Sequence, residues 1–132
     1  MSKRTNAFDP SKINLSACVP SCKESDLHPE LLEYIRRAQH LAGFTFDITS
    51  GFRPKSWEFS RGRNGSSSHS RIPGLAVDIS TPNSHVRYKV LVSLACVGVP
   101  RLGVGKNFIH ADIDETKAHP IIFDYYDSKN AK

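Results

Sequence analysis

The sequence predicts an α+β fold in which a small, mainly antiparallel sheet packs against two helices. Two segments carry apolar residues at helical spacing, and short segments rich in branched and aromatic side chains lie around them. The chain of 132 residues suits one domain, and it contains no internal repeat. We therefore expect a single hydrophobic core shared by both helices and the sheet.

Both predicted helices have residues near their ends that favour helix starts and stops. Asp26 or His28 can cap the first helix, and Pro29 suits its first turn. Gly43 follows the last apolar position and ends this helix. The second helix is expected over residues 83–98. The apolar stripe of the first helix consists of Leu31, Leu32, Ile35, Ala38 and Leu41.

The predicted strands are short segments that alternate apolar and polar residues or form brief apolar runs. They are Phe44–Ser50, Leu75–Ile79, Arg101–Val104, Asn107–Ile113 and Ile121–Tyr125. A polar segment from Pro54 to Arg71 separates the first two strands. We expect it to be a long irregular loop, and loops of that length are usually functional or disordered.

The ends of the chain are predicted to lie outside the folded domain. Residues 1–25 contain Pro10 and Pro20 and show no sustained period, which indicates an arm of mostly irregular structure along the domain surface. The domain itself is expected over residues 26–126, and residues 127–132 form a C-terminal tail.

Charge and hydropathy exclude several classes of partner. The formal net charge of +5 favours contact with polyanions, either nucleic acid or acidic cell-wall polymer. The basic residues are scattered and form no recognised nucleic-acid motif, so we expect no nucleic-acid partner.

No run reaches the roughly 20 apolar residues of a membrane helix, so we expect no membrane insertion. The start of the chain lacks the apolar stretch of a signal peptide, which predicts synthesis in the cytoplasm without secretion by that route.

Cys18, Cys22 and Cys96 form an odd set without the paired spacing of a zinc knuckle. We expect reduced, partly buried thiols. A disulfide between Cys18 and Cys22 is the alternative if the protein matures in an oxidising compartment.

His69, Asp78 and His110 are the candidate metal ligands. Two imidazoles and one carboxylate leave a tetrahedral zinc ion one open position, which is the property of a catalytic zinc site. Asp78 lies between Val77 and Ile79, where a carboxylate is costly unless an opposite charge compensates it. The alternative is that Asp78 caps a local turn and that both histidines are ordinary surface residues.

Three motifs occur in order along the chain, namely Thr49–Pro54, Ser67–Ile79 and Gly103–Ile113. Together they resemble the signatures of the zinc D-Ala-D-Ala carboxypeptidase family. This family belongs with the hedgehog-like metallopeptidases and includes phage L-alanyl-D-glutamate endolysins. The likeness covers roughly residues 26–126.

The resemblance implies a hedgehog/DD-peptidase-like fold and one zinc ion held by His69, Asp78 and His110. It also implies that Arg53 is catalytic, either by contacting substrate or by stabilising charge near the scissile carbonyl. Eight residues separate His69 from Asp78, more than the family usually has. A loop can absorb this insertion, because the entropic cost of closing a loop grows slowly with its length.

The general base is the second departure from the family. Relatives carry an acid three positions before the last ligand or a histidine two before it, where this chain has Asn107 and Phe108. Alternate residues of a strand share a face, so Asp112 should project beside His110. Asp112 is the catalytic candidate, either as general base or as the partner that orients His110.

The implied function is zinc-dependent hydrolysis of peptide bonds in the stem peptides of bacterial peptidoglycan. The enzyme is expected to be a D-Ala-D-Ala carboxypeptidase or an endolysin-type endopeptidase, and a phage lysis or entry enzyme would fit. Such a product would reach the cell wall after release from the cytoplasm or travel in a virion. The alternative is a catalytically inactive, zinc-containing module that binds the cell wall.

The substrate-binding candidates are Arg53, Ser67 and Trp57. Ser67 can hydrogen-bond near His69, and Arg53 can grip a carboxylate with two parallel hydrogen bonds. Trp57, Phe59 and Tyr125 could line a substrate groove, although single aromatic residues more often cover the core. We expect the protein to act as a monomer on a peptidoglycan peptide.

Overall fold

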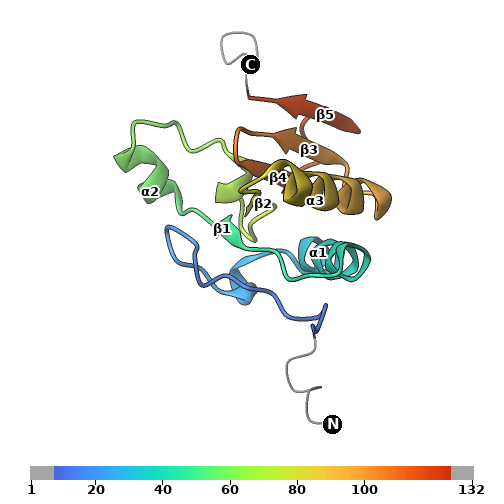
Figure 1. The fold of residues 1–132 in the computed structure, drawn as a ribbon. Coiled ribbons are helices and arrows are strands. Elements are labelled where there is room, and N and C mark those ends of the chain that lie inside the picture. The colour runs from blue at the N-terminus through green and yellow to red at the C-terminus, as the bar shows by residue number, and fades with distance from the viewer. Residues whose placement is uncertain (1–7, 126–132) are drawn as a thin grey trace.

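The computed structural model describes residues 8–125, which contain one five-stranded sheet and three α-helices (Figure 1). The strand order is β1-β2-β4-β3-β5. All neighbouring strands are antiparallel except β3 and β5, which are parallel. The strands are β1 (Ile48–Ser50), β2 (Ala76–Ser80), β3 (Arg101–Val104), β4 (Phe108–Asp112) and β5 (Ile121–Asp124). The predicted α+β class and mainly antiparallel sheet are confirmed.

The two long helices are α1 (Pro29–Ala42) and α3 (Ser84–Cys96), which pack against each other. His28 caps α1 by accepting a hydrogen bond from the backbone N–H of Glu30, and α1 ends at Gly43 as expected. Asn83 caps α3 through its side-chain oxygen. Within residues 8–125, no helix is both long enough and apolar enough to cross a bilayer.

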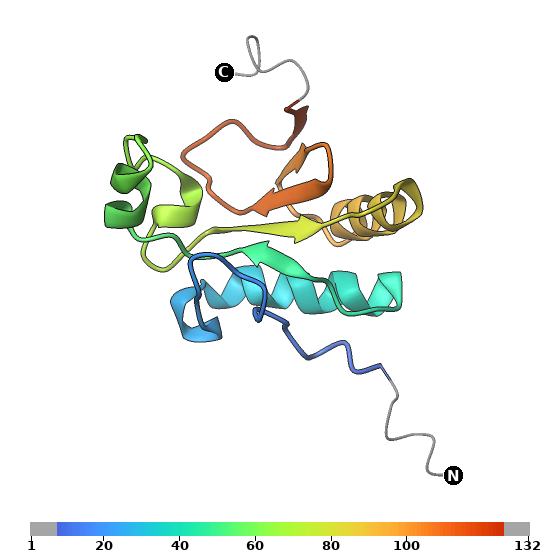
Figure 2. The ribbon, with the colours of Figure 1, turned by 60° about the vertical axis from the view of Figure 1, so that its left-hand side comes forward.

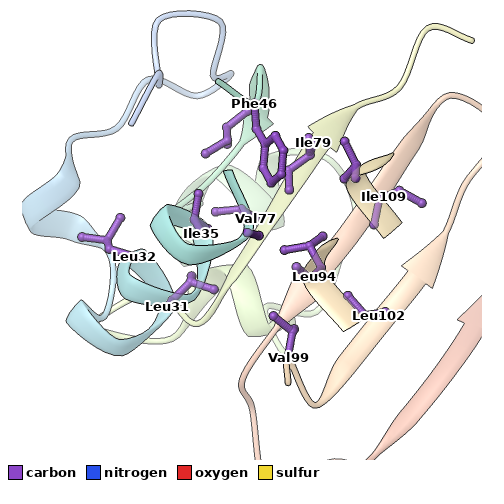
Figure 3. Close-up of a cluster of buried hydrophobic side chains, with 14 of the residues drawn as sticks. Leu31, Leu32, Ile35, Phe46, Val77, Ile79, Leu94, Val99, Leu102 and Ile109 are labelled. Atoms are coloured by element: carbon purple, nitrogen blue, oxygen red, sulfur yellow. The ribbon is translucent and has the colours of Figure 1, made fainter. Parts of the chain in front are cut away.

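The hydrophobic core lies between these two helices and one face of the sheet (Figure 3). Val77 and Ile79 of β2 and Ile109 and Ala111 of β4 are fully buried in it. Because successive side chains of a strand point to opposite faces, the residues between them lie on the other face of the sheet. That second face therefore carries Asp78 of β2 and His110 of β4, which pair with each other.

The segment from Pro54 to Arg71 is not the irregular loop that the sequence predicts. It contains a third helix, α2 (Lys55–Ser60), and a 3-10 turn, η3 (Ser68–Ser70), which lie together beside one end of the sheet (Figure 2). The prediction of two helices was therefore wrong. The buried residue of α2 is Glu58, a carboxylate, so this helix has no apolar stripe by which its sequence could reveal it.

The first predicted strand, Phe44–Ser50, is also shorter than expected, because β1 covers only its last three residues. Phe46 is fully buried, but its backbone N–H donates to the side-chain oxygen of Gln39 at 2.8 Å. That bond takes the place of a ladder bond to a neighbouring strand. The other four predicted strands agree with the structure to within one residue at each end.

The described part of the N-terminal arm, residues 8–25, is mostly irregular and runs along α1 and β1 (Figure 2). The side-chain amide of Gln39 donates to the backbone oxygens of Pro10 and Lys12 at 2.9 and 2.8 Å. The backbone N–H of Val19 donates to the backbone oxygen of Thr49. The expected C-terminal tail, residues 127–132, lies outside the described residues.

Candidate metal centre

The register of the sheet brings a row of residues side by side on the face opposite the helices. Asp78 of β2 pairs with His110 of β4 and with Ser50 of β1. On the other side of His110 lie Gly103 of β3 and then Phe123 of β5. A β-carbon on Gly103 would lie 2.7 Å from the Phe123 ring, so only glycine lets this ring approach His110, with 5.9 Å between the two ring centroids.

His69 reaches this row from η3. The side chain of Ser67 caps the turn by accepting a hydrogen bond from the backbone N–H of His69 at 3.1 Å, as the sequence suggested. Ser68 donates from its hydroxyl to the buried carboxylate of Asp114 at 2.7 Å. The backbone oxygen of His69 accepts from the backbone N–H of Arg53. The Ser67 contact closes the turn, and the contacts with Asp114 and Arg53 fasten it to other parts of the chain.

The three predicted ligands, His69, Asp78 and His110, come together and could hold a metal ion, with their ligand atoms all within 4.8 Å of one another. The distance from His69 Nε2 to Asp78 Oδ1 is 3.5 Å. The distance from His110 Nδ1 to the same oxygen is 3.0 Å. A tetrahedral ion with ligand distances of about 2.0–2.1 Å separates its ligand atoms by about 3.3 Å, so the arrangement fits such an ion.

In each ring, the hydrogen bond at one nitrogen leaves the other nitrogen facing Asp78. His69 Nδ1 lies 2.8 Å from the backbone oxygen of Gly51, which can only accept, so Nδ1 carries the proton and Nε2 is left as ligand. His110 Nε2 lies 2.6 Å from Asp112 Oδ2. Asp112 thereby holds the proton on Nε2 and leaves Nδ1 of His110 facing Asp78.

The pKa values of the three groups follow from their burial and mutual contacts. Burial disfavours the charged imidazole and lowers the pKa of His69. Burial acts against the charged forms of Asp78 and His110 as well, but their hydrogen bonds outweigh it. Those bonds lower the pKa of Asp78 and raise the pKa of His110. The cluster is therefore arranged around the negative charge of Asp78, which a cation can share in place of a proton.

Asp112 is enclosed by protein groups and is fully buried. Besides His110, its carboxylate contacts the guanidinium of Arg101 at 2.9 Å and accepts from the backbone N–H of Asp114 at 3.0 Å. Burial raises the pKa of Asp112, but the bond to His110 and the charge of Arg101 outweigh it and keep that pKa low. His110 and Asp112 project together, as predicted, and Arg101 is a partner that the sequence analysis missed.

A cavity of about 400 Å³ lies over the cluster, and a second of about 350 Å³ shares Asp78 and Phe108 with it. The predicted residues Arg53 and Ser67 line the first cavity, and Asn107 lines the second. The first cavity also contains Tyr125, which the sequence analysis named as a possible groove residue. It further contains residues that the sequence analysis did not assign to the site, namely Arg63, Ser68, Arg101, Lys117 and Phe123.

Arg53 is held in the cavity by three side chains. Its Nε lies 2.9 Å from a carboxylate oxygen of the buried Glu58. Its two terminal nitrogens donate to the hydroxyls of Ser50 and Ser67 at 3.1 and 3.3 Å. Burial lowers the pKa of Arg53, and the charges of Asp78 and Glu58 oppose that shift. The guanidinium is thus fixed in orientation near the candidate ligands.

Trp57 does not line either cavity among the described residues. Its ring lies 4.0 Å from the guanidinium carbon of Arg61 and 5.7 Å from that of Arg53. Tyr125 does line the first cavity, and burial raises the pKa of its hydroxyl, which therefore stays protonated. Alternation along the last predicted strand places Phe123 on the same face as Tyr125, and this signal could have assigned Phe123 to the site as well.

Comparisons of the chain with models of protein families, with curated proteins and with solved structures gave no match. The function of the site must therefore be inferred from its own residues and their geometry.

Proposed function

We propose that this chain is a zinc metallopeptidase with a hedgehog/DD-peptidase-like fold, related to the zinc D-Ala-D-Ala carboxypeptidase family, that hydrolyses peptide bonds in the stem peptides of bacterial peptidoglycan. The observation that carries the proposal is the convergence of two imidazole nitrogens and one carboxylate oxygen from three separate elements. The three ordered motifs that resemble this family supply the ligands and Arg53.

The donor set favours zinc over the hard cations. Calcium and magnesium prefer ligand sets made of oxygen alone, whereas His69 and His110 offer nitrogen. Two histidines and one carboxylate leave zinc an open position for water or substrate. Zinc bound there would polarise a carbonyl group and lower the pKa of a water molecule toward about 7.

Arg53 supplies the charge that such a reaction needs. The guanidinium lies in the cavity with the ligands, and Glu58 fixes its orientation from behind. It can hold a substrate carboxylate or stabilise the oxyanion that develops at the scissile carbonyl. Because the two cavities share Asp78 and Phe108, the room for substrate extends beyond the first cavity. This favours an endopeptidase over a carboxypeptidase, which needs room for only one terminal residue beyond the scissile bond.

A specific observation also favours the alternative, an inactive zinc-containing module that binds the cell wall. The acidic residues that line the first cavity, among those described, are Asp78 and Asp112. Asp78 is a ligand candidate, and Asp112 is occupied by His110 and Arg101. Neither is a carboxylate free to take a proton from water, so the peptidase must use another base or release Asp112 during turnover.

The deciding experiment digests purified peptidoglycan with the zinc-loaded chain and identifies the new termini by mass spectrometry. Wild type should release peptides cut at one bond of the stem, and His69→Ala should release none. The matched control is His85→Ala, which removes an exposed histidine of α3. Arg53→Lys should retain zinc but cleave roughly ten- to hundredfold more slowly, because it loses the fork of charged hydrogen bonds.

Each outcome of the digestion separates the candidates. A folded chain that binds zinc stoichiometrically and sediments with the cell wall without cutting it would be the inactive module. A folded chain without affinity for zinc would refute both functions. Unchanged cleavage by Arg53→Lys would remove the guanidinium fork from the mechanism.

A further inference from the structure

Cys18 and Cys22 lie together against the end of β1. A β-carbon on Gly51 would lie 2.6 Å from the sulfur of Cys22 and 3.7 Å from that of Cys18. Both sulfurs therefore lie close to the same position beside Gly51. Each thiol also influences the pKa of the other. Glycine at position 51 permits this approach, because any side chain there would displace Cys22.

The two thiols differ in environment. Cys18 is 6% exposed, and its sulfur donates to the backbone oxygen of Ile48 at 3.3 Å. The interaction with Cys22 and burial both raise the pKa of Cys18. Cys22 is half-buried, and its interaction with Cys18 and a hydrogen bond from the backbone N–H of Phe52 lower its pKa to about 7, although burial opposes them. Cys22 is thus the nucleophilic, accessible thiol, and Cys18 is the buried thiol beside it.

We propose that Cys18 and Cys22 are a modification site, oxidised to an intramolecular disulfide by a disulfide oxidant such as glutathione disulfide or a thiol–disulfide oxidoreductase. The thiolate of Cys22 attacks one sulfur of glutathione disulfide, which forms a mixed disulfide and releases one glutathione thiolate. Cys18 then gives its proton to solvent, and its sulfur attacks the sulfur of Cys22, which releases the second glutathione. The two cysteines lose two electrons and two protons in total, and the oxidant becomes two glutathione thiols.

The two cysteines lie beside the backbone contact that orients His69. The backbone oxygen of Gly51 is the acceptor for Nδ1 of His69, and the backbone N–H of Val19 donates to the oxygen of Thr49. A bond between Cys18 and Cys22 would close a short loop within the arm, and this loop lies against Gly51, whose carbonyl orients His69. Because the cross-link restricts the unfolded chain, the oxidised protein should unfold at a higher temperature than the reduced protein.

The test incubates the full chain in glutathione redox buffer, alkylates free thiols under denaturing conditions and maps them by mass spectrometry. The wild type should keep one alkylated cysteine, Cys96, and carry no glutathione. Cys96→Ser should keep none. Cys18→Ser removes the resolving thiol and should trap glutathione on Cys22. Thermal unfolding of the oxidised Cys96→Ser variant should occur several degrees above that of its reduced form.

Three outcomes would overturn the proposal. The first is three alkylated thiols in wild type under conditions that fully oxidise a free peptide of residues 15–25. The second is a stable glutathione adduct on Cys22 of the wild type, which would mean that Cys18 cannot resolve it. The third is an oxidised protein that melts below the reduced one. None of these measurements involves the metal centre or peptidase activity, so the result is independent of the proposed function.

Discussion

His110 is held at both of its ring nitrogens, which makes its orientation independent of any ligand. Asp112 accepts from Nε2 at 2.6 Å, and Asp78 lies 3.0 Å from Nδ1. Arg101 in turn fixes Asp112 at 2.9 Å. A carboxylate that holds the far nitrogen of a metal-binding histidine sets the tautomer and raises the basicity of the ligand. Of the two roles that the sequence left open for Asp112, this geometry favours the positioning role.

Asp112→Asn should therefore weaken zinc binding. The amide is nearly isosteric, but it carries no charge and cannot hold the Nε2 proton as firmly. Zinc affinity should fall about 10- to 100-fold, as measured by competition with a chromophoric chelator. The matched control is Asp124→Asn, which makes the same change at an exposed position of β5 and should leave affinity unchanged. Unaltered zinc affinity together with lost turnover would instead assign Asp112 as the general base.

At the scale of elements, the turn that carries His69 is fastened to the chain that follows β4. Asp114 is buried and accepts from the hydroxyls of Ser68 and Thr116 at 2.7 and 2.6 Å. Its carboxylate also lies 3.4 Å from Nε of Arg71. This network ties η3 to the strand that supplies His110, so it keeps two ligands at a constant distance.

Asp114→Asn should destabilise the protein by about 1–3 kcal/mol at neutral pH, the cost of weakening buried hydrogen bonds to a charged group. Burial raises the pKa of Asp114, but the bonds from Thr116 and Ser68 outweigh it and lower that pKa to about 2. A carboxylate with a lowered pKa contributes fully above its unfolded value of about 3.9 and loses its contribution as the pH falls toward its folded value.

The difference in unfolding free energy between wild type and Asp114→Asn should thus shrink from pH 6 to pH 3. Urea unfolding across that range measures it. A difference that stays constant with pH would show that the charge of Asp114 does not stabilise the turn.

The elements that the sequence predicted are those with a periodic apolar pattern. The spacing of Leu31 and Ile35 on α1 and the alternation along β4 report burial directly, so their positions could be found. α2 and η3 leave no such pattern, because contacts between distant polar residues hold them in place. Glu58 bonds Arg53 and Arg63, which no local period of the sequence predicts.

At the scale of the whole molecule, the candidate metal centre exists only when the sheet and η3 have formed. Asp78 and His110 are neighbours because β2 pairs with β4, and His69 joins them from a turn outside the sheet. That these three residues would lie together could be predicted from residue type and motif order. Which ring nitrogen each histidine offers could not, because Gly51 and Asp112 decide it by tertiary contacts.

The three candidate ligands lie far apart in the sequence, so the unfolded chain has no preformed site. The free energy of metal binding therefore adds to the free energy of folding. At a free zinc concentration of about 100 times the dissociation constant, the bound ion should stabilise the fold by about 2.7 kcal/mol. Calorimetry with and without chelator should show a higher unfolding temperature with zinc. The gain should shrink in acid, because protons compete for His69 and His110. His69→Ala should lose the zinc-dependent shift in unfolding temperature, and the control His85→Ala should keep it. Equal unfolding temperatures of the wild type with and without zinc would mean that this cluster binds no ion.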